Sequence, residues 1–103
     1  MRITLFAVRH KNKVFEFAEP LSVTVEKQYG IWWLNSEGAL AEEEYDKSPA
    51  RVIQAFASTV NMLWFAYAKC NDKKLDKGAR ELKQTVLRLV KRRKVCRHKL
   101  KGR

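Results

Sequence analysis

The sequence predicts a single α+β domain, in which an antiparallel β-meander of three to four strands is followed by two α-helices packed on one face of the sheet. Short apolar runs separated by polar turns fill the first half, and residues 21–26 alternate apolar and polar side chains, as a strand with one buried face does. In the second half, apolar residues recur every three or four positions, which is the period of a packed helix. Strands that precede helices are typical of the α+β class, and 103 residues with 46% hydrophobic content suffice for one core.

The expected strands are short and are bounded by turn residues. They comprise residues 3–8, 14–17, 21–26, 31–34 and, as a further strand, 39–45. Polar turns separate them at residues 9–13, 29–30 and 35–38. Pro20 cannot donate a backbone hydrogen bond to a ladder, so the second strand is expected to end near Ala18 or to bend at the proline.

Residues 48–70 are expected to form the central helix, around which the other elements are arranged. Ser48 is a suitable N-cap, and Pro49 suits the first helical position because its missing N–H would have no partner there. Its apolar stripe consists of Val52, Phe56, Val60, Leu63 and Tyr67. Polar residues occupy the opposite face, so the segment is too polar to span a bilayer.

A second helix is expected over residues 75–94, capped by Asp72 or Asp76. Its narrower apolar stripe consists of Leu75, Ala79, Leu82, Val86 and Leu89. We place the end of the folded domain at residue 90, so that residues 91–103 form a basic C-terminal tail whose first residues prolong the helix.

The net charge of +11 is concentrated at the C-terminus. Residues 1–87 hold thirteen Lys and Arg against eleven Asp and Glu, whereas residues 88–103 carry nine basic residues and no acid. Such a localised excess predicts contacts with nucleic-acid phosphates. An acidic protein, an anionic membrane surface or no partner at all are the alternatives. The candidate nucleic-acid-binding residues are Arg88, Lys91, Arg92, Arg93, Lys94, Arg97, Lys99, Lys101 and Arg103.

No residue pattern predicts a catalytic site, a metal site or a cofactor. The acidic residues Glu42, Glu43, Glu44 and Asp46 are the type that binds hard cations, but a charged edge strand that resists sheet-to-sheet association explains them better. His10 and His98 lack catalytic partners at a recognisable spacing. Cys96 and His98 supply too few ligands for structural zinc, and Cys70 and Cys96 are expected to stay reduced in a cytoplasmic protein.

Three aromatic residues are candidates for a partner interface. Trp32 and Trp33 are adjacent in a predicted strand, so their side chains must point to opposite faces. Phe65 falls on the same side of the central helix as the polar residues Asn61 and Lys69. Because aromatic residues are enriched at protein contacts, Trp32, Trp33 and Phe65 indicate an interface, with a homodimer as one form of it.

Residues 14–56 resemble the HicB-like antitoxin domains. The resemblance lies in the hairpin that ends at residues 21–26, in the third strand Trp32-Trp33-Leu34-Asn35-Ser36 and in the helix entry Tyr45-Asp46-Lys47-Ser48-Pro49. It implies a partial ribonuclease H-like sheet and a non-catalytic domain that binds a protein partner such as a toxin.

These observations together predict a cytoplasmic protein without enzymatic activity, which acts as an antitoxin-like regulatory or nucleic-acid-associated binding module. No signal peptide or membrane anchor is expected, because residues 1–8 hold only a strand's length of apolar residues. The alternative is a protein-interaction subunit, homodimeric in one form, whose basic tail docks an acidic partner. A metal-dependent nuclease that uses the acidic residues is a third reading.

Overall fold

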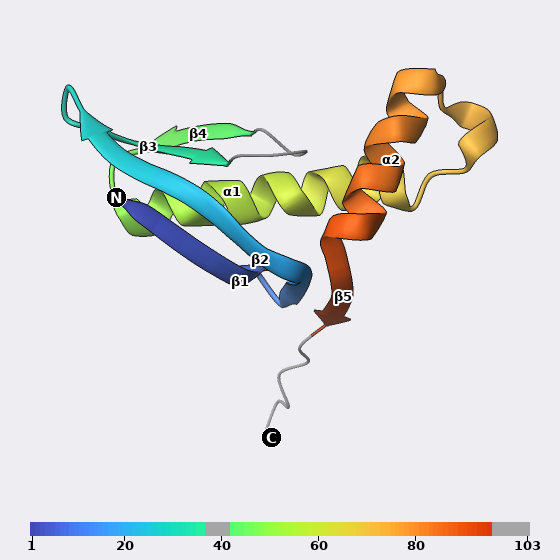
Figure 1. Ribbon diagram of the computed structural model, residues 1–103, viewed down its shortest axis with the longest axis horizontal. Helices are drawn as coiled ribbons and strands as arrows, with labels where there is room; N and C mark the ends of the chain where they lie inside the picture. Colours follow the sequence, from blue (N-terminus) through green and yellow to red (C-terminus); the bar gives the residue numbers. More distant parts are fainter. Residues whose placement is uncertain (37–41, 96–103) are drawn as a thin grey trace.

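Four strands form an antiparallel meander, and two helices and a fifth strand follow it (Figure 1). The computed structural model describes residues 1–36 and 42–95. The meander consists of β1 (Arg2–His10), β2 (Lys13–Gln28), β3 (Ile31–Ser36) and β4 (Glu43–Asp46). It is followed by α1 (Pro49–Leu63), the π-helical turn η1 (Trp64–Ala68), the 3₁₀ turn η2 (Asp72–Lys74), α2 (Lys77–Leu89) and β5 (Val90–Val95). The predicted α+β class, with a meander followed by two helices, is confirmed.

Strand β2 is the longest strand and is shared by three neighbours. It pairs with β1 along both of its halves, with β5 at residues 13–17 and with β3 at residues 23–28. The pairing register with β1 shifts between Leu5 and Ala7, and residues 18–20 have no ladder partner in the described part of the chain. Pro20 is therefore tolerated, because no ladder bond is required of it. The expected strand end near Ala18 is wrong, because β2 continues past Pro20 to Gln28. The alternative, a bend at the proline, agrees with the shift of register and the missing ladder partners there.

The turn between β2 and β3 is the tight two-residue turn that the sequence predicts. Tyr29 and Gly30 both have positive φ, 53° and 77°, and Gln28 pairs with Ile31 directly before and after them. Two positive φ values define the type I′ turn, whose twist matches that of the flanking strands and which favours glycine.

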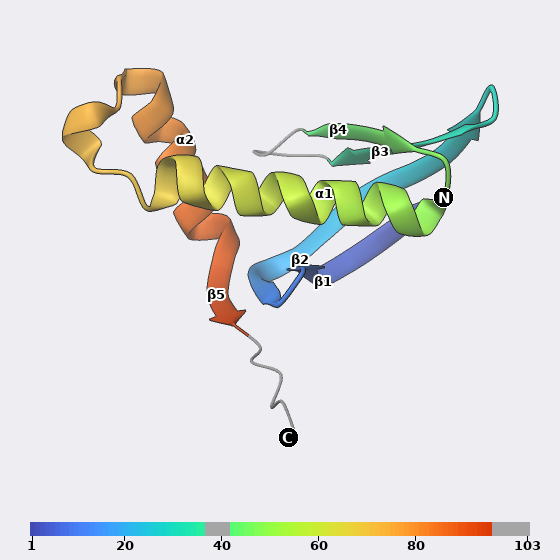
Figure 2. The ribbon, with the colours of Figure 1, turned by 180° about the vertical axis from the view of Figure 1, so that it is seen from behind.

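Helix α1 begins as predicted and covers one face of the sheet. The Ser48 side chain accepts a hydrogen bond from the Arg51 backbone N–H at 3.2 Å, and Pro49 is the first helical residue. In Figure 2 the helix lies in front of the sheet, where it contacts β1, β3 and β4. Its buried residues, Val52, Phe56, Ala57, Val60 and Leu63, contain four of the five residues of the predicted stripe. The fifth, Tyr67, lies in η1 and packs against the core half-buried.

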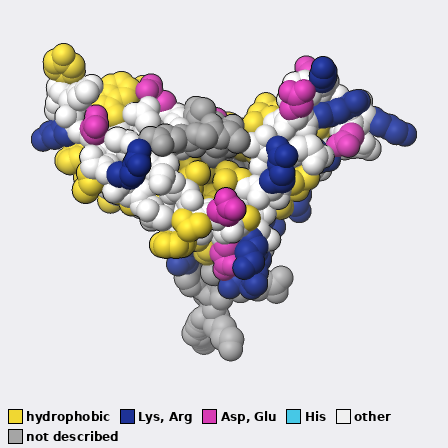
Figure 3. Space-filling model, viewed as in Figure 1, with side chains coloured by type: hydrophobic (Ala, Val, Ile, Leu, Met, Phe, Trp, Pro, Cys, Tyr) yellow, Lys and Arg dark blue, Asp and Glu magenta, His cyan; other side chains and the backbone are white. Residues whose placement is uncertain are grey.

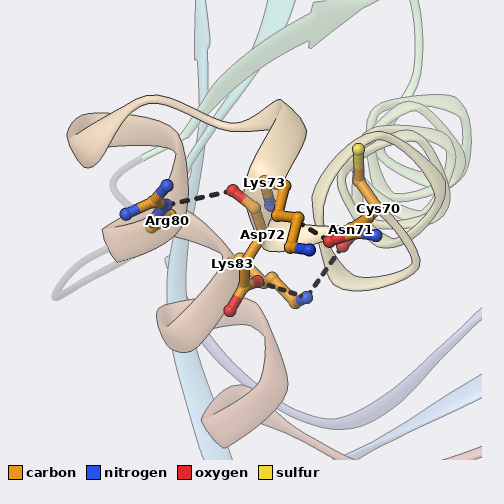
Figure 4. A network of polar contacts seen from close by, with 6 residues as sticks. All are labelled: Cys70, Asn71, Asp72, Lys73, Arg80 and Lys83. Atoms are coloured by element: carbon orange, nitrogen blue, oxygen red, sulfur yellow. Dashed lines mark hydrogen bonds and ion pairs between the residues drawn. The ribbon is translucent and has the colours of Figure 1, made fainter.

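A polar network holds the connection between η1 and α2 (Figure 4). The Lys83 ammonium group donates to the Cys70 carbonyl oxygen at 2.8 Å and to the Asp72 carboxylate at 2.7 Å. Arg80 Nε donates to the Asp72 carbonyl oxygen at 3.0 Å. Asp76, one of the two predicted caps, accepts from the Ala79 N–H at 2.8 Å and starts α2. Helix α2 is thereby fixed against η1, from where it also contacts β2 and β5.

Helix α2 ends at Leu89, and the prediction that it continues to Lys94 is wrong. Residues 90–95 form β5, which pairs antiparallel with residues 13–17 of β2. Val90 is buried beside Phe17, its ladder partner, and the strand satisfies backbone groups of β2 that would otherwise form a free edge. The sequence predicts the C-terminal end of the folded domain at residue 90. In the structure, Val90 is the first residue of β5.

One hydrophobic core lies between the sheet and the helices. Its fully buried members include Phe15, Val23, Leu34, Val52 and Phe56, which come from β2, β3 and α1. Within residues 1–36 and 42–95, no helix is long and apolar enough to cross a membrane.

Candidate nucleic-acid interface

Basic side chains project from both faces of β5. On the face turned away from α1, the Lys94 ammonium group lies 3.0 Å and Arg92 Nε lies 3.7 Å from the Glu16 carboxylate on the neighbouring strand β2. The hydrogen bond from Lys94, with the positive charges of Lys94, Arg92 and Lys91, lowers the pKa of Glu16 against the opposing effect of its partial burial. In Figure 3, Lys and Arg side chains gather at β5 beside an acidic side chain. On this face, one carboxylate therefore offsets part of the charge of two of the predicted residues.

On the other face, Arg93 meets an aromatic ring. Its guanidinium carbon lies 5.2 Å from the centroid of the Phe65 ring, and the ammonium nitrogens of Lys13 and Lys69 lie 4.3 Å and 6.0 Å from the same centroid. We call Lys13, Phe65, Lys69 and Arg93 the Phe65 cluster. Its members come from β2, from η1 and the residue after it, and from β5. The fold therefore assembles this cluster from three segments that are distant in sequence.

The backbone geometry explains why these side chains meet. Lys13 and Phe15 lie two residues apart on β2 and so share a face, and Arg93 is the ladder partner of Phe15. The Phe15 ring packs edge-on against Trp64, with 6.0 Å between centroids, and this contact seats the start of η1 above the strand. Phe65, the next residue, then lies over the end of the sheet where Lys13 and Arg93 project.

The three cations of the Phe65 cluster form no ion pair with the described carboxylates. Arg93 Nε is buried and has no hydrogen-bond partner in the described part of the chain. The negative face of an aromatic ring attracts cations, but at a partly exposed site it contributes only about 0.5–1 kcal/mol. The 43% exposed Phe65 ring thus lies among three charges that lack a counterion within the described residues, an arrangement suited to a polyanion.

The remaining predicted basic residues are placed as follows. Arg88, in the last turn of α2, and Lys91, in β5, are both exposed. Arg97, Lys99, Lys101 and Arg103 lie outside the described residues, and in the sequence they follow β5 closely.

Trp32 and Trp33 point to opposite faces, as predicted. Trp32 packs against the core on the helix-covered side. Trp33 lies on the other side, where its ring centroid is 5.2 Å from that of Tyr45, a 65% exposed residue of β4. No described helix other than α1 packs on β3 or β4, so this aromatic pair lies on an uncovered face. Tyr45 was not identified as an interface residue, because only the strand register places it opposite Trp33.

Glu43, Glu44 and Asp46 belong to the edge strand β4, and Glu42 directly precedes it. Residues 39–41 of the expected strand 39–45 lie outside the described residues. Strand β4 lies at the end of the meander, and Glu43 and Glu44 project to opposite faces of it. The Thr59 hydroxyl of α1 donates to Glu44, and burial, with the neighbouring charge of Glu44, raises the pKa of Glu42. Among the residues that the structure describes, no three His, Cys, Asp or Glu side chains are grouped to hold a metal ion.

A groove of about 860 Å³ runs between the end of β1 and α1. His10 lines it beside Arg9 and Lys11, and Ile53 and Ala57 are among the α1 residues that line it. Elsewhere, Cys70 is a half-buried free thiol, while Cys96 and His98 lie outside the described residues. That Cys96 stays reduced and that His98 has no catalytic partner therefore remain predictions.

Sequence reasoning named Phe65 and Arg93 for two different reasons and did not name Lys13 as a site residue. The spacing along β2 contains a signal for Lys13, because it shares the face of Phe15 and Phe17. No spacing in the sequence, however, connects Lys13 with residues 65 and 93. The cluster depends on the pairing of β5 with β2.

No family model matches the chain, and comparisons with curated proteins and with solved structures find no match.

Proposed function

We propose that this chain is a non-catalytic nucleic-acid-binding module that acts in an antitoxin-like, regulatory way. The observation that carries the proposal is the Phe65 cluster, in which Lys13, Lys69 and Arg93 converge without a described carboxylate partner. Nucleic-acid phosphates are the natural counterions for such a group, because binding releases condensed cations from the nucleic acid.

The surroundings of the cluster support the same ligand. Lys91 is exposed on the same strand as Arg93, and Arg88 is exposed in the last turn of α2, which leads into that strand. Arg92 and Lys94 share a single carboxylate, Glu16. Four further basic residues follow β5 in the sequence. The described residues of β5 and its neighbours therefore carry a positive excess, which attracts a polyanion over distance as well as on contact.

A charge-matched pair of variants tests the proposal. The double variant Lys13→Gln/Arg93→Gln removes two cluster cations, and Lys73→Gln/Lys77→Gln removes two exposed lysines near the start of α2. We expect full-length protein to bind a labelled oligonucleotide with log affinity falling linearly against log salt. The cluster variant should lose about two contacts from that slope, at about 0.7 per contact on a single strand, whereas the control should keep most of it.

Two outcomes would contradict the proposal. One is the absence of measurable affinity for DNA or RNA at about 50 mM salt, where phosphate contacts are strong. The other is an equal loss of slope in both double variants, because net charge alone would then explain binding.

The regulatory part of the proposal draws on the HicB-like resemblance of residues 14–56 and goes with a cytoplasmic setting. It predicts a protein partner whose activity the chain restrains. Coexpression with the product of a neighbouring gene tests this part, and relief of growth inhibition caused by that product is the expected result. Unchanged inhibition would count against the antitoxin-like role and leave nucleic-acid binding to be judged separately.

A second candidate function, a homodimeric protein-interaction subunit, is favoured by the Trp33–Tyr45 pair. These rings lie on the uncovered face, beside a shallow depression of about 190 Å³ lined by Glu26, Gln28 and Glu43 among others. Sedimentation over a range of protein concentrations distinguishes the candidates. Dimerisation that Trp33→Ser abolishes supports the interaction subunit, whereas a monomer at every concentration opposes it.

A further inference from the structure

We propose that the Phe65 cluster binds single-stranded nucleic acid, with one unpaired base stacked on the Phe65 ring and the adjoining phosphates held by Lys13 and Arg93. This inference rests on the proposed function and specifies its ligand. It assigns a role to the Phe65 ring, because binding by charge alone would need only the three cations.

The position of the ring is the first step. Phe65 is 43% exposed although it belongs to η1, whose other face packs against α2 and the core. It lies at the end of the sheet, between a lysine of β2 and an arginine of β5. An exposed aromatic ring within a basic surface is how proteins that bind single strands hold bases, since every base has a face that can stack.

The cations around the ring provide the second step. Lys13 is within 4.3 Å and Lys69 within 6.0 Å of the centroid, and both have flexible side chains that can leave the ring for a phosphate when a base takes their place. Arg93 is less free, because its Nε is buried, and its planar guanidinium is suited to two parallel hydrogen bonds with one phosphate. The cluster thus has an aromatic ring for a base and three cations within about 6 Å of it for the backbone.

The choice of a single strand over a duplex follows from access to base faces. In a duplex both faces of each internal base are stacked on neighbouring bases, so the Phe65 ring meets only backbone and groove. Duplex binding would use the cations and gain nothing from the ring. The ring should therefore contribute selectively to single-strand affinity.

The test uses Phe65→Leu in the full chain, with labelled oligo(dT) and a duplex as probes. Phe6→Leu is the control, because Phe6 is 68% exposed on β1, which lies on the opposite side of β2 from β5. We expect Phe65→Leu to weaken oligo(dT) binding about tenfold, within the range observed for loss of one stacked base, and to leave duplex binding and the salt slope unchanged. Phe65→Tyr should retain wild-type affinity, and Phe6→Leu should not alter it.

The possible failures are distinguishable. If wild-type protein binds neither probe, the proposed function itself has failed. If wild-type binds and Phe65→Leu weakens single-strand and duplex binding equally, the ring serves only to position the cations. Unchanged oligo(dT) binding by Phe65→Leu overturns stacking outright. Equal thermal unfolding midpoints of Phe65→Leu and wild type show that a loss of affinity does not arise from unfolding. Phe65→Tyr keeps an aromatic ring at this position, so its affinity shows whether the ring is what matters.

Discussion

Phe56 lies at the middle of α1, where its side chain is completely buried against the sheet. We expect Phe56→Ala to lower the free energy of unfolding by about 3–5 kcal/mol, because it removes buried surface and leaves a cavity that the close-packed core cannot fill. Gln54, two residues earlier on the same helix, is exposed, and Gln54→Ala should be nearly neutral. Chemical denaturation of both variants provides the measurement. Equal midpoints would mean that the packed face of α1 is assigned wrongly.

Glu16 predicts a pH dependence at the contact between β2 and β5. Its pKa is lowered from the ordinary value of 4.5, chiefly by the hydrogen bond from Lys94. A carboxyl group whose pKa is lowered in the folded state contributes stability above its ordinary pKa and loses it as the pH falls through the lowered value. Wild type should therefore be more stable than Glu16→Gln at neutral pH, and the difference should vanish in acid.

Unfolding midpoints of the wild type and of Glu16→Gln, measured from neutral pH into the acid range, test this expectation. The raised pKa of Glu42 has the opposite sign, but it is present in both proteins and cancels in the difference. About 1 M salt should also reduce the difference at neutral pH, because the ion pairs are partly exposed. A difference that is constant with pH would exclude the ion pairs as its source.

Strand β5 limits how far the chain can be truncated from its C-terminus without loss of stability. A chain that ends after Val95 keeps the full ladder with β2, whereas a chain that ends after Val90 keeps only the partner of Phe17 and exposes the edge of β2 at residues 13–16. We expect the shorter chain to lose more than about 5 °C of thermal midpoint relative to the longer one, the shift that a loss of about 1 kcal/mol gives in a domain of this size. Thermal unfolding followed by circular dichroism measures it, and equal midpoints would show that β5 does not stabilise the fold.

The elements that the sequence predicted correctly have a periodic pattern of apolar residues within their own segment. The alternation around Val23 and Val25 marks β2, and the four-residue spacing of buried residues marks α1, because local side-chain periodicity reports which face is covered. Residues 91–94 have no such pattern. Four consecutive basic residues favour a helix at least as well as a strand, so pairing with β2, more than 70 residues earlier, determines their conformation.

The candidate site also combines residues that the sequence identifies with a proximity that only tertiary pairing produces. Phe65 and Arg93 each stand out in the sequence, one as an aromatic on a polar helix side and the other within a basic run. Their proximity to Lys13 is a tertiary consequence of β5 pairing. A helix continued to Lys94 would have separated Arg93 from β2, so the error about one element concealed the site.

In the described part of the molecule, clusters of acidic and of basic side chains lie on different strands of the sheet. The glutamates Glu42, Glu43 and Glu44 lie in or next to β4, whereas the described basic residues 91–94 lie on β5. Changing all three glutamates to Gln should leave nucleic-acid binding intact or slightly strengthen it, because a source of repulsion is removed. Titration with the labelled oligonucleotide measures this effect. Loss of a divalent-dependent nuclease activity in this variant would instead contradict the proposal that the chain is not an enzyme.

The sharing of β2 between β1, β3 and β5 has a consequence for biosynthesis. While the ribosome is making α2, residues 13–17 of β2 can already pair with β1, but their other edge must wait for β5, which is synthesised more than 70 residues later. An unpaired strand edge with neighbouring apolar side chains is a template for pairing with another chain. Phe15 and Phe17 lie on that edge, so we expect nascent chains that lack β5 to aggregate more readily than the complete chain.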